Sequence, residues 1–210
     1  MRRILFLALA AVHMAACAQK VTELPKPNLE RQTLSVMQAY QQRHSERVFS
    51  DKMLSEQDLS DLLWAAQGKN REDGRLTAAT ARNMQEIRMY VFTAKGVSYY
   101  DPQTHSLTTV AEGDHRDIVA DRQAFAKDAP VSLVLVADMD KYGSTSQHAQ
   151  WMAGVDVGIV CENINLFCSA AGLNTVPRGT MDQKAIQQLL GLSKNQTPVI
   201  NNPIGYPVTK

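Results

Sequence analysis

The longest periodic pattern in the chain lies between residues 146 and 171 and predicts a single long helix that Gly172 ends. Its apolar residues recur at helical spacing but occupy more than one face: Trp151, Met152, Val155, Ile159, Val160, Ile164, Phe167 and Ala171. Asp156 and Glu162 exclude a membrane span. A helix that is apolar nearly all round must be covered on all sides, either by a sheet and other helices or by a second subunit.

Shorter patterns predict the remaining elements. Helical spacing predicts helices over residues 29–42, 55–67, 114–126 and 182–190, and Ser55 and Gly68 are suitable residues for the two ends of the second helix. The strands predicted at 86–93 and 97–100 flank Lys95 and Gly96 and form a hairpin. The continuous apolar run at 131–137 predicts a buried central strand, and 197–200 a last strand. The class is α+β, with one domain over residues 31–210.

The first eighteen residues have the layout of a secretory signal. Arg2 and Arg3 precede an apolar run at residues 4–12, and small residues follow. Met14-Ala15-Ala16-Cys17 resembles a bacterial lipobox, in which Cys17 becomes the lipid-anchored first residue. The alternative is cleavage after Ala18, which releases a soluble periplasmic form. The sequence leaves both open.

Residues 19–30 are expected to form a tether, because Pro25 and Pro27 favour extended backbone with no core to join. Cys161 and Cys168 are seven residues apart on the long helix, about 10 Å, which is beyond disulfide reach. We expect both to be free, buried side chains.

Composition narrows the function. The 210 residues are 44% apolar and 20% charged, as in ordinary globular proteins, and Lys+Arg 22 against Asp+Glu 21 gives no electrostatic case for nucleic-acid binding. The sequence contains no G-x-S-x-G, phosphate-binding loop, C-x-x-C or H-E-x-x-H motif, so hydrolases and zinc enzymes have little support, and no metal site is predicted.

Three segments carry chemistry. Arg43, Ser45 and Arg47 alternate, so an extended backbone would direct two guanidinium groups and a hydroxyl to one side, an arrangement that suits phosphate. Asn83 and Gln85 could each offer a donor and an acceptor to a planar heterocycle. Residues 171–179 could present backbone N–H groups. Taken singly, each segment could equally be a solvated helix end, a polar loop or a connection.

Taken in order, the segments resemble the nitroreductase family of FMN-dependent oxidoreductases. R-H-S-E-R-V-F at 43–49 matches the family's R-[RH]-S-x-[RK]-x-F, and residues 80–85 resemble its P-S-S-x-N-x-Q loop. The long helix, with Asp156, Gly158 and Asn163, looks like D-x-G-x-x-x-x-N, and Gly-Tyr-Pro at 205–207 matches the C-terminal motif. Residues 62–71 resemble the branch related to dehydrogenases of peptide azolines.

The resemblance implies a nitroreductase-like fold, a central mixed β-sheet flanked by helices, in an intertwined homodimer with FMN at the subunit interface. It implies hydride transfer between flavin N5 and a small or peptide-like substrate, with no catalytic acid evident. It also implies three groups of FMN-binding residues. The phosphate and ribityl group is Arg43, His44, Ser45 and Arg47. The group contributed by the partner subunit is Thr80, Ala81, Asn83 and Gln85. The group at the pyrimidine edge and N5, acting largely through the backbone, is Pro177, Arg178 and Gly179.

The predicted signal places this domain in the bacterial envelope, periplasmic or lipid-anchored, where NAD(P)H is scarce. Two interpretations follow. The first is an exported FMN oxidoreductase that draws electrons from another source. The second is a protein of this fold that binds flavin without catalysis or has lost it. Arg43, Ser45, Arg47 and Asn83 favour the first interpretation, whereas the missing electron donor favours the second. Ala79-Thr80-Ala81 also offers fewer hydroxyl contacts than the family's Pro-Ser-Ser.

Overall fold

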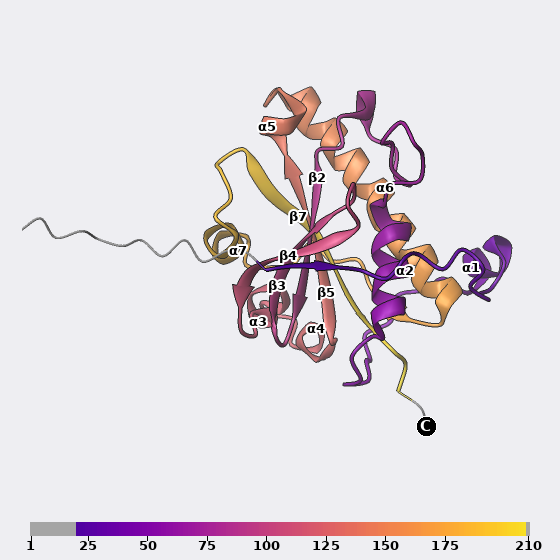
Figure 1. Ribbon diagram of the computed structural model, residues 1–210. Helices are drawn as coiled ribbons and strands as arrows, with labels where there is room; N and C mark the ends of the chain where they lie inside the picture. Colours follow the sequence, from indigo (N-terminus) through magenta and orange to yellow (C-terminus); the bar gives the residue numbers. More distant parts are fainter. Residues whose placement is uncertain (1–19, 209–210) are drawn as a thin grey trace, which may run out of the picture.

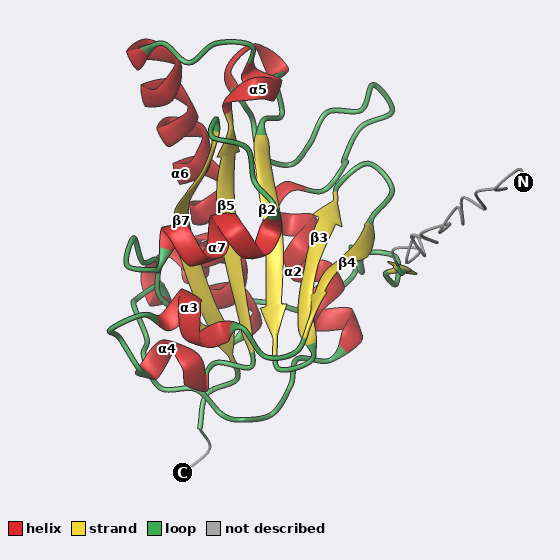
Figure 2. Cartoon of the chain, turned by 90° about the vertical axis from the view of Figure 1, so that its left-hand side faces the viewer, coloured by secondary structure: helices red, strands yellow, loops and turns green. Residues whose placement is uncertain are grey.

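The computed structural model describes residues 20–208, which form three layers (Figure 1). A central sheet carries α2 (Glu56–Gln67) and α6 (Gln147–Ala171) on one face, with α1 (Val36–Gln42) packed against α6. The other face carries α3 (Arg116–Ala120) and α7 (Gln183–Leu190), in front of the sheet in Figure 2. The predicted α+β class is confirmed. The predicted signal and Cys17 lie outside the described residues.

The described strands form a seven-stranded sheet in the order β1-β4-β3-β2-β5-β7-β6. Their bounds are β1 Val21–Glu23, β2 Ile87–Thr93, β3 Gly96–Asp101, β4 Ser106–Glu112, β5 Val131–Asp138, β6 Asn174–Thr175 and β7 Gln196–Gly205. Every pairing among them is antiparallel, so the expectation of a mixed sheet is corrected. The reason is the route between β5 and β7. Helix α6 takes the chain from the end of β5 back toward the end where β5 begins, and the segment through α7 then returns it. Strand β7 therefore starts at Gln196 beside Asp138, the last residue of β5, and runs antiparallel to β5.

Two apolar clusters hold the layers together. The cluster under α2 and α6 includes Leu62, Leu133 and Ile164, and the cluster under α3 and α7 includes Phe92 and Ile186. Strand β5 is buried along its whole length, which confirms the continuous apolar run as a central strand covered on both faces.

The predicted ends of α2, α6 and α7 are confirmed, whereas the helix predicted over 29–42 begins only at Val36, after the N-cap residue Ser35. Ser55 and Ser146 accept hydrogen bonds from backbone N–H groups of the first turns of α2 and α6, and Gly172 closes α6 in the left-handed conformation with φ 70°. The helix predicted over 114–126 is wrong in extent. Asp121 adopts φ 50° and divides the segment into α3 and a short α4 (Phe125–Asp128). The sequence analysis also missed β1, β4, β6 and the short helix α5 (Met139–Tyr142).

The segment expected to be a free tether lies along the domain from residue 20 onward. Strand β1 extends the sheet beside β4, and Ser60 Oγ donates to the carbonyl oxygen of Pro25. The Asn28 N–H donates to Asp61 Oδ1 at 2.8 Å, and Arg31 is paired with Asp61 at 3.0 Å. The backbone of this segment is extended, as Pro25 and Pro27 predicted. It is not a free tether, because the edge of β4 and polar residues of α2 form hydrogen bonds with it, and these contacts cannot be read from the sequence.

Cys161 and Cys168 are free and buried, as predicted. Among residues 20–208, no helix combines the length and apolar character that crossing a bilayer requires.

Candidate functional site

The first predicted binding segment runs in non-helical backbone along the end of the sheet. Helix α1 ends at Arg43, and the chain then passes beside β6. The Glu46 N–H donates to the Thr175 carbonyl oxygen at 2.9 Å, and Asn174 Nδ2 donates to the Val48 carbonyl oxygen at 2.8 Å. These contacts bring the arginine segment next to β6, two residues before Pro177, so two of the three predicted groups approach one another in one chain.

Arg43, Ser45 and Arg47 leave their donors exposed. Within the described part of the chain, none of the three side chains makes a hydrogen bond or an ion pair. Two guanidinium groups and a hydroxyl at alternating positions, all without a hydrogen-bond acceptor, fit an anionic ligand such as a phosphate.

Phe125 links this segment to Arg178. The ring centre of Phe125 lies 6.0 Å from Arg47 Cζ and 5.5 Å from Arg178 Cζ, so the two guanidinium groups both approach one aromatic ring. The sequence analysis did not single out Phe125. In the sequence, Phe125 is simply an apolar residue near the end of the helix predicted over 114–126.

His44 is turned toward its own segment. Its Nδ1 lies 2.5 Å from the Gln42 carbonyl oxygen and its Nε2 2.7 Å from Glu46 Oε1. Accepting partners favour the protonated ring, so the Gln42 carbonyl first and the Glu46 carboxylate second raise the pKa of His44 above its ordinary value. These two partners therefore favour the positively charged form of the imidazole beside Arg43.

The Arg178 side chain is a structural element of the site. It is buried and donates from Nε to Gln123 Oε1 at 2.7 Å and from Nη1 to Asn201 Oδ1 at 2.7 Å. It also donates to the carbonyl oxygens of Val119 and Ala120 at 3.2 and 2.9 Å, and burial lowers its pKa. With its side chain and its N–H engaged, Arg178 fixes the backbone on which Pro177 and Gly179 lie.

Gly179 presents an open face. It is exposed, and a side chain there would meet no atom within 4 Å. The backbone of residues 177–179 is therefore accessible to a ligand at Gly179, whereas Arg178 is engaged in contacts that stabilise the fold.

The loop of residues 80–85 is compact and locally constrained. Its turn contains the short 3₁₀ helix η1 (Ala81–Asn83), and Arg82, Asn83 and Gln85 have φ of 53°, 57° and 51°. These left-handed conformations are costly for non-glycine residues. Hydrogen bonds hold the loop: Gln85 N–H donates to Thr80 Oγ1, and Gln85 Nε2 donates to the Gly74 carbonyl oxygen.

This loop and α1, which directly precedes Arg43, lie near opposite ends of α6 (Figure 1). The Ala81 N–H donates to Asp156 Oδ2 at 2.8 Å, whereas α1 contacts the helix near its C-terminus, where Ser169 Oγ donates to the Ala39 carbonyl oxygen. From residue 156 to residue 169 the helix rises about 20 Å. Thr80, Ala81, Asn83 and Gln85 therefore do not meet the other two groups within one chain.

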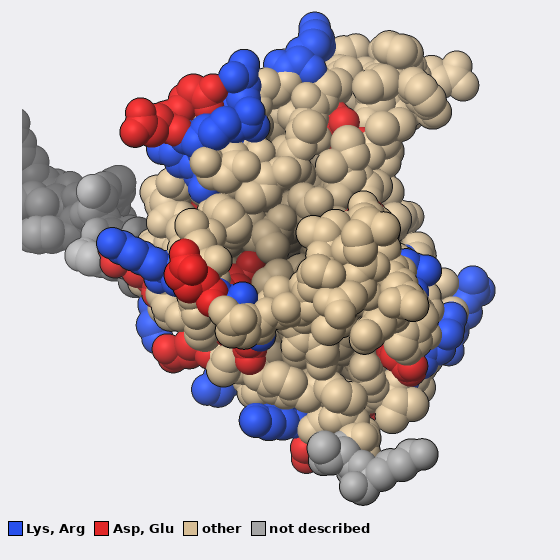
Figure 3. Space-filling model, turned by 90° about the vertical axis from the view of Figure 1, so that its right-hand side faces the viewer, with Lys and Arg blue, Asp and Glu red and all other residues tan. Residues whose placement is uncertain are grey.

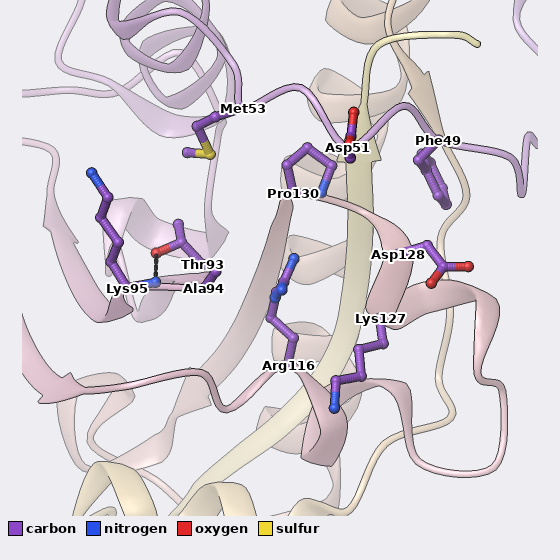
Figure 4. A pocket seen from close by; sticks show the side chains of 10 residues that line it. All are labelled: Phe49, Asp51, Met53, Thr93, Ala94, Lys95, Arg116, Lys127, Asp128 and Pro130. Atoms are coloured by element: carbon purple, nitrogen blue, oxygen red, sulfur yellow. Dashed lines mark hydrogen bonds between the residues drawn. The ribbon is translucent and has the colours of Figure 1, made fainter.

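A pocket of about 730 Å³ begins at Phe49, two residues after Arg47 in the chain (Figure 4). It is lined by Phe49, Asp51, Met53, Thr93, Ala94, Lys95, Arg116, Lys127, Asp128 and Pro130. None of the predicted binding residues lines it. The guanidinium of Arg116 is held by Asp114 at 2.7 Å, which lowers the pKa of Asp114 to about 2. Helix α4 separates the two features, since Phe125 faces the arginines while Lys127 and Asp128 line the pocket.

The outer face of α6 is apolar and uncovered in a single chain. Trp151, Val155 and Ile159 are 64%, 41% and 36% exposed at a spacing of four residues. Gly154 and Gly158 lie between them with open space above their backbone. On this side of the molecule, charged residues lie mainly around the margin and the middle is largely uncharged (Figure 3). The expectation that the helix is covered on all sides is not met within one chain.

A layered α+β domain with unengaged anion-binding donors at the end of its sheet has the arrangement of a cofactor-binding protein. The model of the nitroreductase family matches residues 40–206, and the chain belongs to this family. Membership places it among oxidoreductases.

Similar proteins agree with this assignment. A nitroreductase homologue of known structure from Ralstonia eutropha JMP134 is 30% identical, with 90% of each chain covered and a TM-score of 0.83. A nitroreductase homologue from Methanocaldococcus jannaschii is 26% identical over 199 residues, which cover 89% of this chain and 97% of the relative. The NADPH:FMN oxidoreductase from Vibrio harveyi, complexed with NAD+, is 18% identical with a TM-score of 0.65 over 83% of this chain and 68% of that one, and shares the fold.

Proposed function

We propose that this protein is an FMN-dependent oxidoreductase. The observation that carries the proposal is the set of three unengaged donors, Arg43, Ser45 and Arg47, held beside β6. When bound, FMN supplies hydride exchange at N5 with a small organic or peptide-like substrate. The residues fit this cofactor because a flavin phosphate carries close to two negative charges and accepts several charged hydrogen bonds.

The chain's own residues have distinct tasks in this proposal. Arg43, Ser45 and Arg47 hold the phosphate, and His44 adds positive charge beside them when it is protonated. The backbone at Pro177 and Gly179, fixed by Arg178, orients the pyrimidine edge. The loop with Thr80, Ala81, Asn83 and Gln85 supplies amide and hydroxyl groups and excludes water from the ring.

We also propose that a second copy of the chain supplies that loop. Within one chain the loop is about 20 Å from the arginine segment along α6, so a composite site needs two subunits. The exposed stripe of Trp151, Val155 and Ile159 supports a homodimer, because a second helix can approach closely over Gly154 and Gly158.

The Trp151→Asp variant is expected to weaken this dimer by about 2 kcal/mol or more, because a large aromatic anchor is replaced by a charge. Light scattering over a concentration series measures the change. Lys184→Asp on α7, at the opposite face of the sheet, is the matched control and should leave association unchanged. A wild-type protein that stays monomeric and still retains FMN would contradict the shared site.

We propose that the protein works in the bacterial envelope, because its first eighteen residues, including Cys17, have the pattern of a secretory signal. Cell fractionation of the full-length chain is expected to show processed protein outside the cytosol. Loss of membrane attachment in Cys17→Ser would support the lipid-anchored form, and a processed, soluble wild type would support cleavage after Ala18. An uncut cytosolic wild type would overturn the proposal and favour a cytosolic oxidoreductase.

The experiment that tests the proposed function is an absorption spectrum of the purified protein, followed by photoreduction and by reoxidation with organic acceptors. We expect a flavin spectrum with about one FMN per subunit and turnover with at least one acceptor. Bound flavin that no acceptor reoxidises would support non-catalytic binding, and protein that neither retains nor rebinds FMN would refute the proposal.

A further inference from the structure

A buried carboxyl group without a donor lies next to the loop of residues 80–85. Glu86 follows the loop directly, and its side chain is fully buried. In the described part of the chain, no N–H or O–H group of another residue donates to either carboxyl oxygen of Glu86. The Asp156 carboxyl group is also buried, and its proximity raises the pKa of Glu86. Two buried carboxylates facing one another would be strongly unfavourable.

A single proton removes this conflict. If Glu86 is protonated, its O–H can donate to the Asp156 carboxylate. Asp156 Oδ2 already accepts the Ala81 N–H at 2.8 Å, so the proton completes a chain from Glu86 through Asp156 to the loop. The loop needs such an anchor, because Arg82 and Asn83 are held in left-handed conformations.

We propose that Glu86 and Asp156 share one proton and act as positioning residues for the loop of residues 80–85, so that loss of this proton releases the loop and weakens FMN binding. The effect on FMN rests on the proposed function, whereas the shared proton does not. Because both residues lie behind the loop, neither is a catalytic residue.

The surrounding charges favour the protonated form. Burial raises the pKa of Glu86 to about 7, and the Asp156 carboxylate of α6 adds to the shift. Lys141 of α5 opposes it weakly, and the nearby Asp138 of β5 is engaged by Arg88. Since the folded-state pKa lies above the ordinary value of 4.5, the stability that protonated Glu86 contributes is fully present below about pH 4.5. It is lost as the pH rises through about 7.

The proton itself can be observed without flavin. Infrared spectroscopy of the FMN-free protein is expected to show the C=O stretch of a buried, protonated carboxyl group at about pH 6 that fades by about pH 8. The band should be absent in Glu86→Gln, which keeps a donor toward Asp156. It should persist in Glu112→Gln, an exposed carboxyl group on β4. A wild type without a titrating band, or a band that survives in Glu86→Gln, would overturn the proposal.

The positioning role is tested by FMN titration of the same proteins. From about pH 6 to about pH 8, FMN affinity of the wild type is expected to fall by about tenfold more than that of Glu86→Gln, because only the wild type loses the proton. Asp156→Asn, which removes the second carboxylate, should also lose this extra pH dependence. Equal pH dependence in wild type and Glu86→Gln would overturn the positioning role. If no protein binds FMN at any pH, the proposed function fails, and the infrared band still decides the shared proton.

Discussion

Replacement of Arg178 by alanine is expected to lower the free energy of unfolding of the FMN-free protein by about 3 kcal/mol or more. The buried guanidinium makes four hydrogen bonds, and its removal leaves the carbonyl oxygens of Val119 and Ala120 without donors. Each buried, unsatisfied polar group costs about 1–3 kcal/mol. Denaturant unfolding measures the loss, which corresponds to a fall in Tm of about 6–12 °C.

Arg122→Ala is the matched control, because Arg122 is an exposed arginine next to Gln123, one of the residues that accept from Arg178. Its effect should stay within about 0.5 kcal/mol. If Arg178→Ala unfolded like the wild type but lost FMN, the guanidinium would serve the ligand instead of the fold.

Replacement of Arg43 or Arg47 by alanine is expected to weaken FMN binding by about tenfold or more. A hydrogen bond to a charged group is worth about 1.5–3 kcal/mol, and both side chains are exposed, so their removal should cost affinity without costing stability. Fluorescence titration of FMN-free protein measures the dissociation constant, and thermal unfolding checks the fold.

Lys184→Ala removes one positive charge from α7 and should leave FMN affinity unchanged, so it separates a specific contact from the overall charge. Unchanged affinity in both arginine variants would refute the assignment of the phosphate site.

The elements with strong local patterns could be predicted from the sequence. Ser55, Ser146 and Gly172 mark helix ends through their own hydrogen bonds and conformations, and the apolar run of β5 reflects burial on both faces. Strand β4 could not be predicted as readily. It is only partly buried, between β3 and β1, and therefore lacks a clear alternation of apolar and polar residues.

Contacts between distant segments account for most of what the sequence did not predict. The edge position of β1 depends on β4, and the antiparallel course of β7 depends on the route through α6 and α7. The composition of the candidate site also depends on contacts between distant segments. The alternation of Arg43, Ser45 and Arg47 predicted an exposed donor set, but Phe125 and the buried partners of Arg178 belong to the site only because the fold brings them there.

The central claim is that two subunits build each FMN site, one with the arginine segment and the other with the loop. Mixing two defective variants tests it directly. Arg43→Ala carries an intact loop, and Asn83→Asp carries an intact arginine segment while keeping a residue type that tolerates the left-handed backbone. Each mixed dimer would contain one site built from the two intact halves.

After subunit exchange at equal amounts, verified with two affinity tags, we expect tight FMN binding to return at about a quarter of all sites, because half of the dimers are mixed and each regains one site. Exchanged dimers that recover no tight FMN binding would contradict a site shared between subunits.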